Sequence, residues 1–389
     1  MKLKNKILTL KYISRKPMTR FEIMNRTHFS AGAVSQMTDE LLEEGWILEG
    51  EFDDKKSTDT VRTRRQRLLK LNADKAYCAG LSIHDREISA GVINLSGHII
   101  EKQTKTINNP DAQSILLSAK ECLGALLKKT TVKVSGLGII SPGSINNYGL
   151  VLSCNRIPGY QNINLPAVFG EITDLPICAG NNASACALAE KWFGNAGFLA
   201  NFITFIVGYG IGSGIFVNGR LVRGCNGFSS EFGHVIINPN GPLCSCGSYG
   251  CSEVICSCRA IENKIREISR QNVIPDLMSC ENPGSVFESI VHSAVRGDKI
   301  TINILDQMAS DLGILIGMAV NIFNPGKIFL TDAIVKGGDF LLKRIIRAVQ
   351  KKSIKENFEN VSIEYSSLGE DINILGAAGL ARRRILLSI

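Results

Sequence analysis

Four side chains between residues 228 and 253 have the types and spacing of metal ligands. His234 is followed by three cysteines in a Cys-x-Cys-Gly-x-x-Gly-Cys pattern, Cys244, Cys246 and Cys251. One imidazole and three thiolates complete the tetrahedral shell that Zn²⁺ prefers in structural sites. Buried cysteines that only pack are the alternative, but the surrounding prolines and glycines are typical of a loop. We therefore predict a structural zinc ion held by these four residues.

The same stretch contains polar groups that a structural zinc ion does not require. Glu231 lies three residues before His234, so the two would share one face of a helical turn, and Glu253 follows the last cysteine. Two carboxylates and an imidazole could bind the hydroxyl groups of a sugar. The combined pattern, Glu-x-Gly-His and then Cys-x-Cys-Gly-x-x-Gly-Cys-x-Glu, resembles the signature of the ROK family of sugar kinases and repressors. The resemblance implies that Glu231, His234 and Glu253 bind sugar hydroxyls and that His234 also binds the metal.

The composition is that of a soluble globular protein. The chain has 389 residues, enough for two or three domains, with 44% hydrophobic and 21% charged residues. No run of eighteen apolar residues predicts a membrane span, and the N-terminus lacks the cleavage site of a signal peptide. Twelve cysteines without a secretion signal favour a reduced, cytoplasmic protein.

The positive charge is concentrated at the N-terminus. Of the formal net charge of +8, residues 1–70 contribute +5 (15 basic minus 10 acidic side chains). A basic terminal segment on a nearly neutral body indicates an anionic partner for that segment.

The first 71 residues have the pattern of a winged helix-turn-helix domain of the α+β class. A capping box at Thr19 and Glu22, a helix start at Ser30 and a helix stop at Gly45 predict three helices with a short turn before the third. An apolar strand after the third helix and a basic strand at residues 62–70 would form the wing. We therefore predict that double-stranded operator DNA is a partner.

The third helix and the wing carry the candidate DNA contacts. Small and amide side chains in the first half of the helix suit base edges, namely Ser30, Ala31, Ser35 and Gln36. Basic side chains of the wing would contact phosphates or an A·T minor groove, namely Arg62, Arg64, Arg65 and Arg67. A solvated loop is the alternative for the arginine run. The placement also resembles ROK-family repressors, which carry such a domain before the sugar-binding body.

Residues 72–389 predict an α/β body. Strand patterns at 77–83, 88–95 and 99–106 indicate a meander, a helix and a further strand follow it, and a second set of strands begins at residue 202. This body resembles the two-lobed, actin-like (ribonuclease H-like) sugar-kinase fold of the ROK family. The resemblance implies the following division: a small lobe of about 72–180 with a C-terminal helix at 372–389, and a large lobe of about 181–371 with the zinc loop at 234–251.

The residues that ROK kinases use for catalysis are altered. The kinases carry Asn-Asp-Ala-Asn with the aspartate as general base, whereas this chain has Asn181, Asn182, Ala183 and Ser184. An amide cannot accept a proton at neutral pH, although it can hydrogen-bond a sugar hydroxyl. We therefore expect no catalytic residue, with Asn182 in the place of the base, and we expect Asn181, Asn182 and Gly143 to join the sugar ligands.

The nucleotide-binding positions of the family are altered as well. The phosphate hairpin Asp-x-Gly-Gly-Thr is replaced by a segment with His84 and Asp85, and a Gly-Gly pair near the purine site is replaced by Thr331 and Asp332. No ATP is expected. Arg156 replaces a family asparagine, and it could meet a phosphate or acidic sugar or point to solvent. His84 has no predicted role beyond the surface or the core.

These patterns favour a sugar-responsive transcriptional regulator, a repressor whose effector is a sugar or sugar phosphate. By analogy with the family, we expect a homodimer or homotetramer in which lobe closure changes the spacing of two winged domains. One alternative is an active ATP-dependent sugar kinase with an accessory DNA-binding domain. Another is a DNA-binding scaffold that does not respond to sugar.

Overall fold

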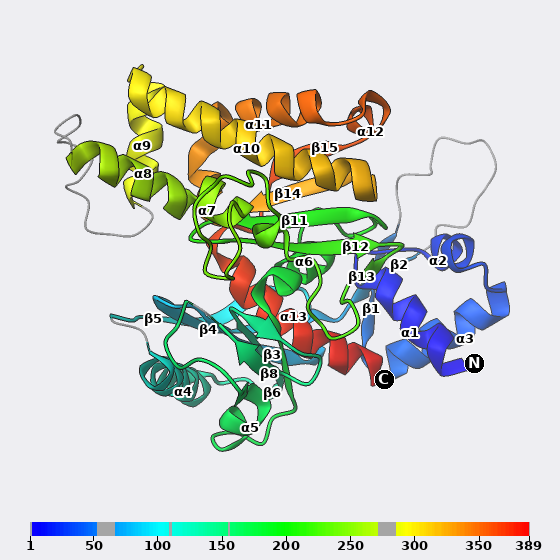
Figure 1. Ribbon diagram of the computed structural model, residues 1–389. Helices are drawn as coiled ribbons and strands as arrows, with labels where there is room; N and C mark the ends of the chain where they lie inside the picture. Colours follow the sequence, from blue (N-terminus) through cyan, green and yellow to red (C-terminus); the bar gives the residue numbers. More distant parts are fainter. Residues whose placement is uncertain (1, 53–66, 109–110, 155, 271–284, 389) are drawn as a thin grey trace.

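Two five-stranded sheets of the same topology form the centre of the protein (Figure 1). A computed structural model describes residues 2–52, 67–108, 111–154, 156–270 and 285–388. Each sheet starts as an antiparallel meander of three strands, and two later strands extend it in parallel. This duplicated arrangement is the actin-like fold, and it confirms the predicted architecture.

The small lobe contains the first sheet, in the order β10-β6-β3-β4-β5. Its strands are β3 (Tyr77–Ile83), β4 (Glu87–Asn94), β5 (Ile99–Thr106), β6 (Val134–Ser141) and β10 (Ile177–Asn181). The outer face is covered by α4 (Ala112–Lys129), and a small sheet of β7 (Ser144–Ile145), β8 (Leu150–Ser153) and β9 (Ile163–Asn164) leads into α5 (Leu165–Gly170). The apolar runs of β3 and β6 are buried on both faces, as expected of central strands.

The large lobe contains the second sheet, in the order β13-β12-β11-β14-β15. Its strands are β11 (Phe202–Val207), β12 (Ile211–Val217), β13 (Arg220–Leu221), β14 (Lys327–Thr331) and β15 (Ser362–Tyr365). Helices cover its outer face and form the largest hydrophobic core: α7 (Ser252–Cys256), α8 (Cys258–Arg270), α9 (Ser285–Val295), α10 (Lys299–Phe323), α11 (Gly338–Lys352) and α12 (Lys355–Glu359).

Two helices, α6 (Asn182–Trp192) and α13 (Ile372–Leu387), cross each other between the sheets (Figure 1). α13 lies almost directly on the small-lobe sheet, because a Cβ atom at Gly138 would stand only 1.7 Å from the Ala377 carbonyl oxygen. α6 packs against both α13 and β12. The two helices therefore connect the lobes mechanically.

The N-terminal domain has the predicted winged helix-turn-helix order of α1 (Lys2–Ile13), α2 (Arg20–Thr27), α3 (Ala31–Glu43), β1 (Ile47–Phe52) and β2 (Arg67–Leu71). Thr19 and Glu22 form the expected capping box of α2, and Ser30 caps α3. The core of this domain also contains Leu386 of α13, which joins Leu10 and Ile13 of α1. The N-terminal domain is thus packed onto the end of the body.

Among the described residues, no helix has both the length and the apolar character that crossing a lipid bilayer requires.

Candidate functional site

The four predicted metal ligands meet in one cluster. The ligand atoms of His234, Cys244, Cys246 and Cys251 all lie within 4.8 Å of one another. His234 Nδ1 is 3.6 Å from Cys244 Sγ, and the Sγ atoms of Cys246 and Cys251 are also 3.6 Å apart. A zinc tetrahedron with bonds of about 2.0–2.3 Å has edges of roughly 3.5–3.8 Å. The donor set and its spacing therefore fit a structural zinc ion.

The backbone of the loop holds these ligands in place. Ile236 pairs with Cys251 and Leu243 with Tyr249 in isolated β-bridges, which fold the loop back on itself. Gly250 has φ +70°, and a Cβ atom there would lie 1.6 Å from the Asn238 carbonyl oxygen, so only glycine fits this crossing. A hydrogen bond from the backbone of Ser248 helps to lower the pKa of the Cys246 thiol to about 7, which favours the thiolate that a metal requires.

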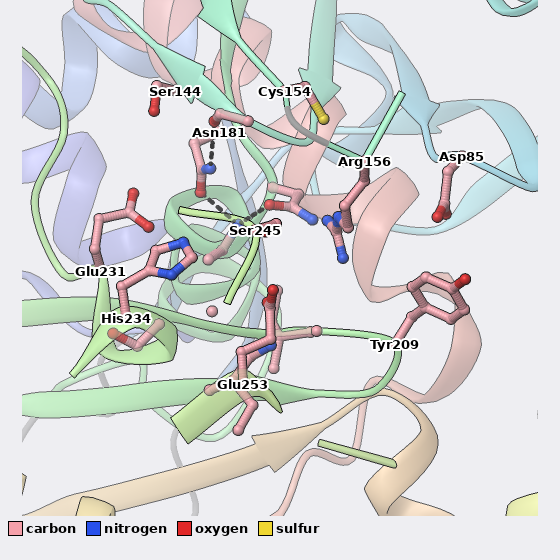
Figure 2. A pocket seen from close by; sticks show the side chains of 18 of the residues that line it. Asp85, Ser144, Cys154, Arg156, Asn181, Tyr209, Glu231, His234, Ser245 and Glu253 are labelled. Carbon is pink, nitrogen blue, oxygen red and sulfur yellow. Dashed lines mark hydrogen bonds between the residues drawn. The ribbon is translucent and has the colours of Figure 1, made fainter. Parts of the chain in front are cut away.

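A cleft of about 160 Å³ lies between the two lobes, directly beside this cluster (Figure 2). Its floor and walls include every residue predicted to bind a sugar: Gly143, Asn181, Asn182, Glu231, His234 and Glu253. The first three come from the small-lobe edge and the start of α6, Glu231 and His234 come from the metal-cluster segment, and Glu253 lies in the first turn of α7. The fold thus brings together residues that are more than a hundred positions apart in the chain.

Acidic groups dominate the metal-cluster side of the cleft. Glu231 precedes a short 3-10 turn that ends at His234, so both side chains face the cleft from one turn (Figure 2). The surrounding protein shields the Glu231 carboxylate and raises its pKa, and the nearby Glu253 carboxylate adds to this effect. Glu253 Oε2 accepts a hydrogen bond of 3.0 Å from the Ile211 backbone N–H. Its other oxygen can accept a hydroxyl of a ligand.

The two asparagines have different environments. Asn181 caps α6, because its Oδ1 accepts hydrogen bonds from the N–H groups of Ala183 and Ser184, and its Nδ2 donates to the Gly143 carbonyl oxygen at 3.1 Å. Asn182 Oδ1 accepts from Ala183 N–H at 2.9 Å. The amide group of Asn182 therefore has donors left for a ligand, whereas Asn181 fixes the edge of the cleft.

The opposite end of the cleft holds four charged or titratable groups that come from three distant segments. His84 and Asp85 occupy the β3–β4 turn, Arg156 follows β8, and Asp332 follows β14 (Figure 2 shows Asp85 and Arg156). Asp332 packs against Gly208, where a Cβ atom would meet its carboxylate at 2.2 Å. Arg156 lines the cleft, where a ligand could reach its guanidinium (Figure 2).

His84, for which the sequence predicted no role, also lines this end of the cleft. Its Nε2 atom is buried without a hydrogen-bond partner. Burial lowers the pKa of the imidazole, and the charge of Asp332 opposes that shift. Asp332 itself has a raised pKa because protein surrounds its carboxyl group.

Exposed side chains mark the first half of α3. Ser30, Ala31 and Gln36 are exposed to solvent, as a DNA-reading surface requires. Ser35 is half-buried, and its hydroxyl donates a hydrogen bond of 3.2 Å to Asp39. The first three residues are therefore the freer candidates for base contacts.

Of the four wing arginines predicted to contact DNA phosphates, the structure describes only Arg67. Arg67 lies 2.6 Å from the Glu49 carboxylate and covers the Phe52 ring at 5.3 Å, so its guanidinium is partly engaged within the domain. The other three predicted phosphate contacts, Arg62, Arg64 and Arg65, lie outside the described residues.

Residues 78–384 match the model of the ROK family. The chain belongs to the ROK family. It is 30% identical to a xylose repressor from Caldicellulosiruptor bescii over 383 residues, which cover 97% of this chain and 94% of the repressor. It is 28% identical to a glucokinase from Thermotoga maritima, and that alignment covers 80% of this chain and 99% of the kinase. Members of this family thus include both repressors and kinases.

Solved structures agree with this assignment. A ROK family transcriptional regulator, described as a homologue of the Escherichia coli MLC protein, superposes with a TM-score of 0.81 at 24% identity. The superposition covers 99% of this chain and 96% of that one, so the two share their fold from end to end.

Sequence reasoning did not predict that His84, Arg156 and Asp332 line the same cleft. Each is an isolated polar residue in its own segment, and no local spacing relates the three. The available signal was that His84 and Asp332 stand close to family glycines and that Arg156 replaces a family asparagine. Such departures can be recognised in the sequence, but their meeting in one cleft requires the fold.

Proposed function

We propose that this ROK protein is a sugar-responsive, DNA-binding transcriptional regulator that represses genes of carbohydrate uptake or catabolism. The observation that carries the proposal is how much of the chain aligns with each kind of relative. The xylose repressor aligns with 97% of the chain, including the winged domain, whereas the glucokinase aligns with 80%. A winged helix-turn-helix domain attached to a sugar-kinase body supports a regulator.

The sugar would bind through hydroxyl contacts to Glu231 and Glu253, the free donors of Asn182 and the ring nitrogen of His234 that faces away from the metal cluster, with Gly143 and Asn181 forming the edge. His234, Cys244, Cys246 and Cys251 would hold a zinc ion, which supplies structural rigidity to the loop. The side chains on that loop would then be held in the correct positions before the ligand arrives.

The residue at the position of the kinases' general base argues against phosphoryl transfer. Asn182 cannot act as the general base, and the absence of a positioned base typically costs 10²–10⁴ in rate. Asp332 and His84 stand close to the positions that the kinases give to glycines near the nucleotide, and a carboxylate there would repel phosphate groups. We infer that the protein has no kinase activity and does not bind ATP.

Sugar binding would reach the DNA-binding domain through α6 and α13. α6 starts at the cleft with Asn182 and ends near Phe198, whose ring lies 4.5 Å from the Arg26 guanidinium of the DNA-binding domain. α13 packs against α6 and supplies Leu386 to the core of that domain. A cytoplasmic homodimer or homotetramer would convert this movement into altered spacing of two recognition helices on an operator.

The test is operator binding by the purified protein. Fluorescence anisotropy with DNA from its own upstream region is measured with and without a panel of pentoses, hexoses, N-acetylhexosamines and their phosphates. We expect one ligand class to change operator affinity at least fivefold, a coupling free energy of about 1 kcal/mol. DNA binding that no ligand alters would support the sugar-blind scaffold, ADP release with any sugar would support the kinase, and an absence of DNA binding would refute the regulator.

A matched pair of variants locates the ligand. Glu253→Gln keeps an oxygen that can accept from the Ile211 backbone N–H but removes the charge. It should weaken ligand binding by about 10-fold or more while leaving ligand-free operator affinity unchanged. Glu356→Gln on the distant helix α12 is the control and should behave as the wild type.

A further inference from the structure

A second cavity lies where the DNA-binding domain meets the body, at the opposite end of α6 from the sugar cleft. It encloses about 320 Å³ between α1, α6, β13 with the segment that follows it, and α13. Figure 1 shows these four elements converging close to the C-terminal end of α13. The cavity shares no lining residue with the cleft.

Five basic side chains and no acidic ones line this cavity. They are Lys11, Lys191, Arg220, Arg223 and Arg383. None of them forms an ion pair with any residue that the structure describes. Like charges gathered from several elements give the cavity a positive potential that attracts anions.

Lys191 has no carboxylate partner among the described residues, and its ammonium group lies 5.7 Å from the centres of the Phe202 and Phe216 rings. Its side chain is 4% exposed, and its ammonium group donates to the backbone carbonyl oxygens of Ala196 and Leu199. Burial lowers its pKa to about 8, and the charges of Arg15 and Lys11 add to the shift. Lys11 has a lowered pKa for the same reason, first through burial and then through neighbouring arginines that include Arg383 and Arg220.

The chemistry of the lining suits a phosphorylated small molecule. Arg220, Arg223 and Arg383 are exposed at the rim, and guanidinium groups bind phosphate oxygens in pairs. Between them and Lys191, the walls contain apolar side chains such as Trp192 and Phe216, which could pack against the organic part of a ligand. The volume is sufficient for a phosphate ester of a small metabolite.

We propose that this cavity is a second effector site that binds a small phosphate-bearing anion between the DNA-binding domain and the body. Lys11 belongs to α1 of the DNA-binding domain, and the other four basic residues belong to the body. A bound anion therefore bridges the DNA-binding domain and the body and restricts their motion relative to each other. This restriction changes the affinity for operator DNA. The site acts independently of the sugar cleft.

The experiment uses the full-length protein with inorganic phosphate, pyrophosphate and glucose 6-phosphate as probes, each at constant ionic strength adjusted with sodium chloride. Isothermal titration calorimetry should show saturable binding of at least one probe. The double variant Arg220→Gln/Arg383→Gln should weaken that binding at least tenfold. Arg384→Gln is the matched control, because Arg384 neighbours Arg383 on α13 but points toward the Ile177 carbonyl oxygen, and it should bind as the wild type.

Three results would overturn the proposal. The first is an absence of saturable binding at constant ionic strength. The second is binding that survives in the double variant and is lost in Arg156→Gln, which would place the anion in the sugar cleft. The third is a double variant that loses operator affinity without any probe and shows a shallower salt dependence, because the arginines would then contact DNA phosphates. If operator affinity responds to a sugar but no probe binds, the proposed function stands and the second site is refuted. If a probe binds in this cavity but no sugar alters operator affinity, the second site stands and the proposed sugar response is refuted.

Discussion

Asp332 has a backbone conformation that other residue types rarely adopt. Its φ of +75° and ψ of −154° fall in a region populated almost only by glycine. Two substitutions separate the backbone from the side chain at this position. Asp332→Ala removes the carboxylate and keeps the strained backbone, and Asp332→Gly removes both the carboxylate and the strain.

The expected difference in unfolding free energy follows from comparing what each variant loses. Both lose the hydrogen bond of 2.7 Å from Ala333 N–H to Asp332 Oδ1, a loss of about 1 kcal/mol, and both lose the carboxylate. Only the glycine variant recovers the strain of about 1–3 kcal/mol, less about 0.5–1 kcal/mol for the greater freedom of glycine in the unfolded chain. From the middle of both ranges, Asp332→Gly should therefore be more stable than Asp332→Ala by roughly 1 kcal/mol.

The midpoints of urea unfolding measure this difference, and a second aspartate provides the control. Asp339 lies in the first turn of α11, with its side chain 83% exposed and an ordinary helical backbone. There the order should reverse, with Asp339→Ala more stable than Asp339→Gly by about 0.5–1 kcal/mol. If alanine were as stable as glycine at position 332, the backbone there would not be strained and this reasoning would be wrong.

Three further predictions concern the core, the domain interface and the metal. Leu386→Ala should destabilise the DNA-binding domain by about 2–4 kcal/mol, seen as faster hydrogen exchange in α1 to α3, whereas Leu387→Ala, 53% exposed, should change little. Because the pKa of Lys191 is lower in the folded than in the unfolded chain, its contribution should make stability rise from about pH 8 to 10.5, as the folded state loses the proton that the unfolded state keeps. Lys191→Met should reduce this slope in thermal unfolding, and an unchanged slope would exclude Lys191 as a source of it. Cys246→Ala should bind no zinc, as measured by elemental analysis, and should lose the sugar response. Stoichiometric zinc in this variant would contradict the four-ligand site.

The sequence predicted regular elements and local motifs well. The meander strands and the capping box at Thr19 are each encoded within a few residues, so apolar alternation and hydrogen-bonding side chains were sufficient. The spacing of His234 and the three cysteines likewise predicted that their side chains would cluster. The helical turn expected between Glu231 and His234 exists as a short 3-10 turn.

Features that depend on distant contacts could not be predicted in this way. The basic cavity joins α1, α6, β13 and α13, and no spacing in the sequence relates Lys11 to Lys191 or Arg383. Leu386 looked like any apolar residue of a terminal helix, because only the tertiary structure shows that it enters the core of another domain.

The position of Leu386 has a consequence for how the protein is made. The DNA-binding domain is synthesised first, yet its hydrophobic core includes a side chain more than 300 residues further along the chain. At a synthesis rate of roughly 5–20 residues per second, that side chain follows after ~15–60 s. A nascent chain on the ribosome thus carries a recognition helix whose support is incomplete. The hydrophobic core of the N-terminal domain is therefore complete only after the body has been synthesised and α13 has docked, so the proposed DNA reader and the proposed sugar-binding body mature together.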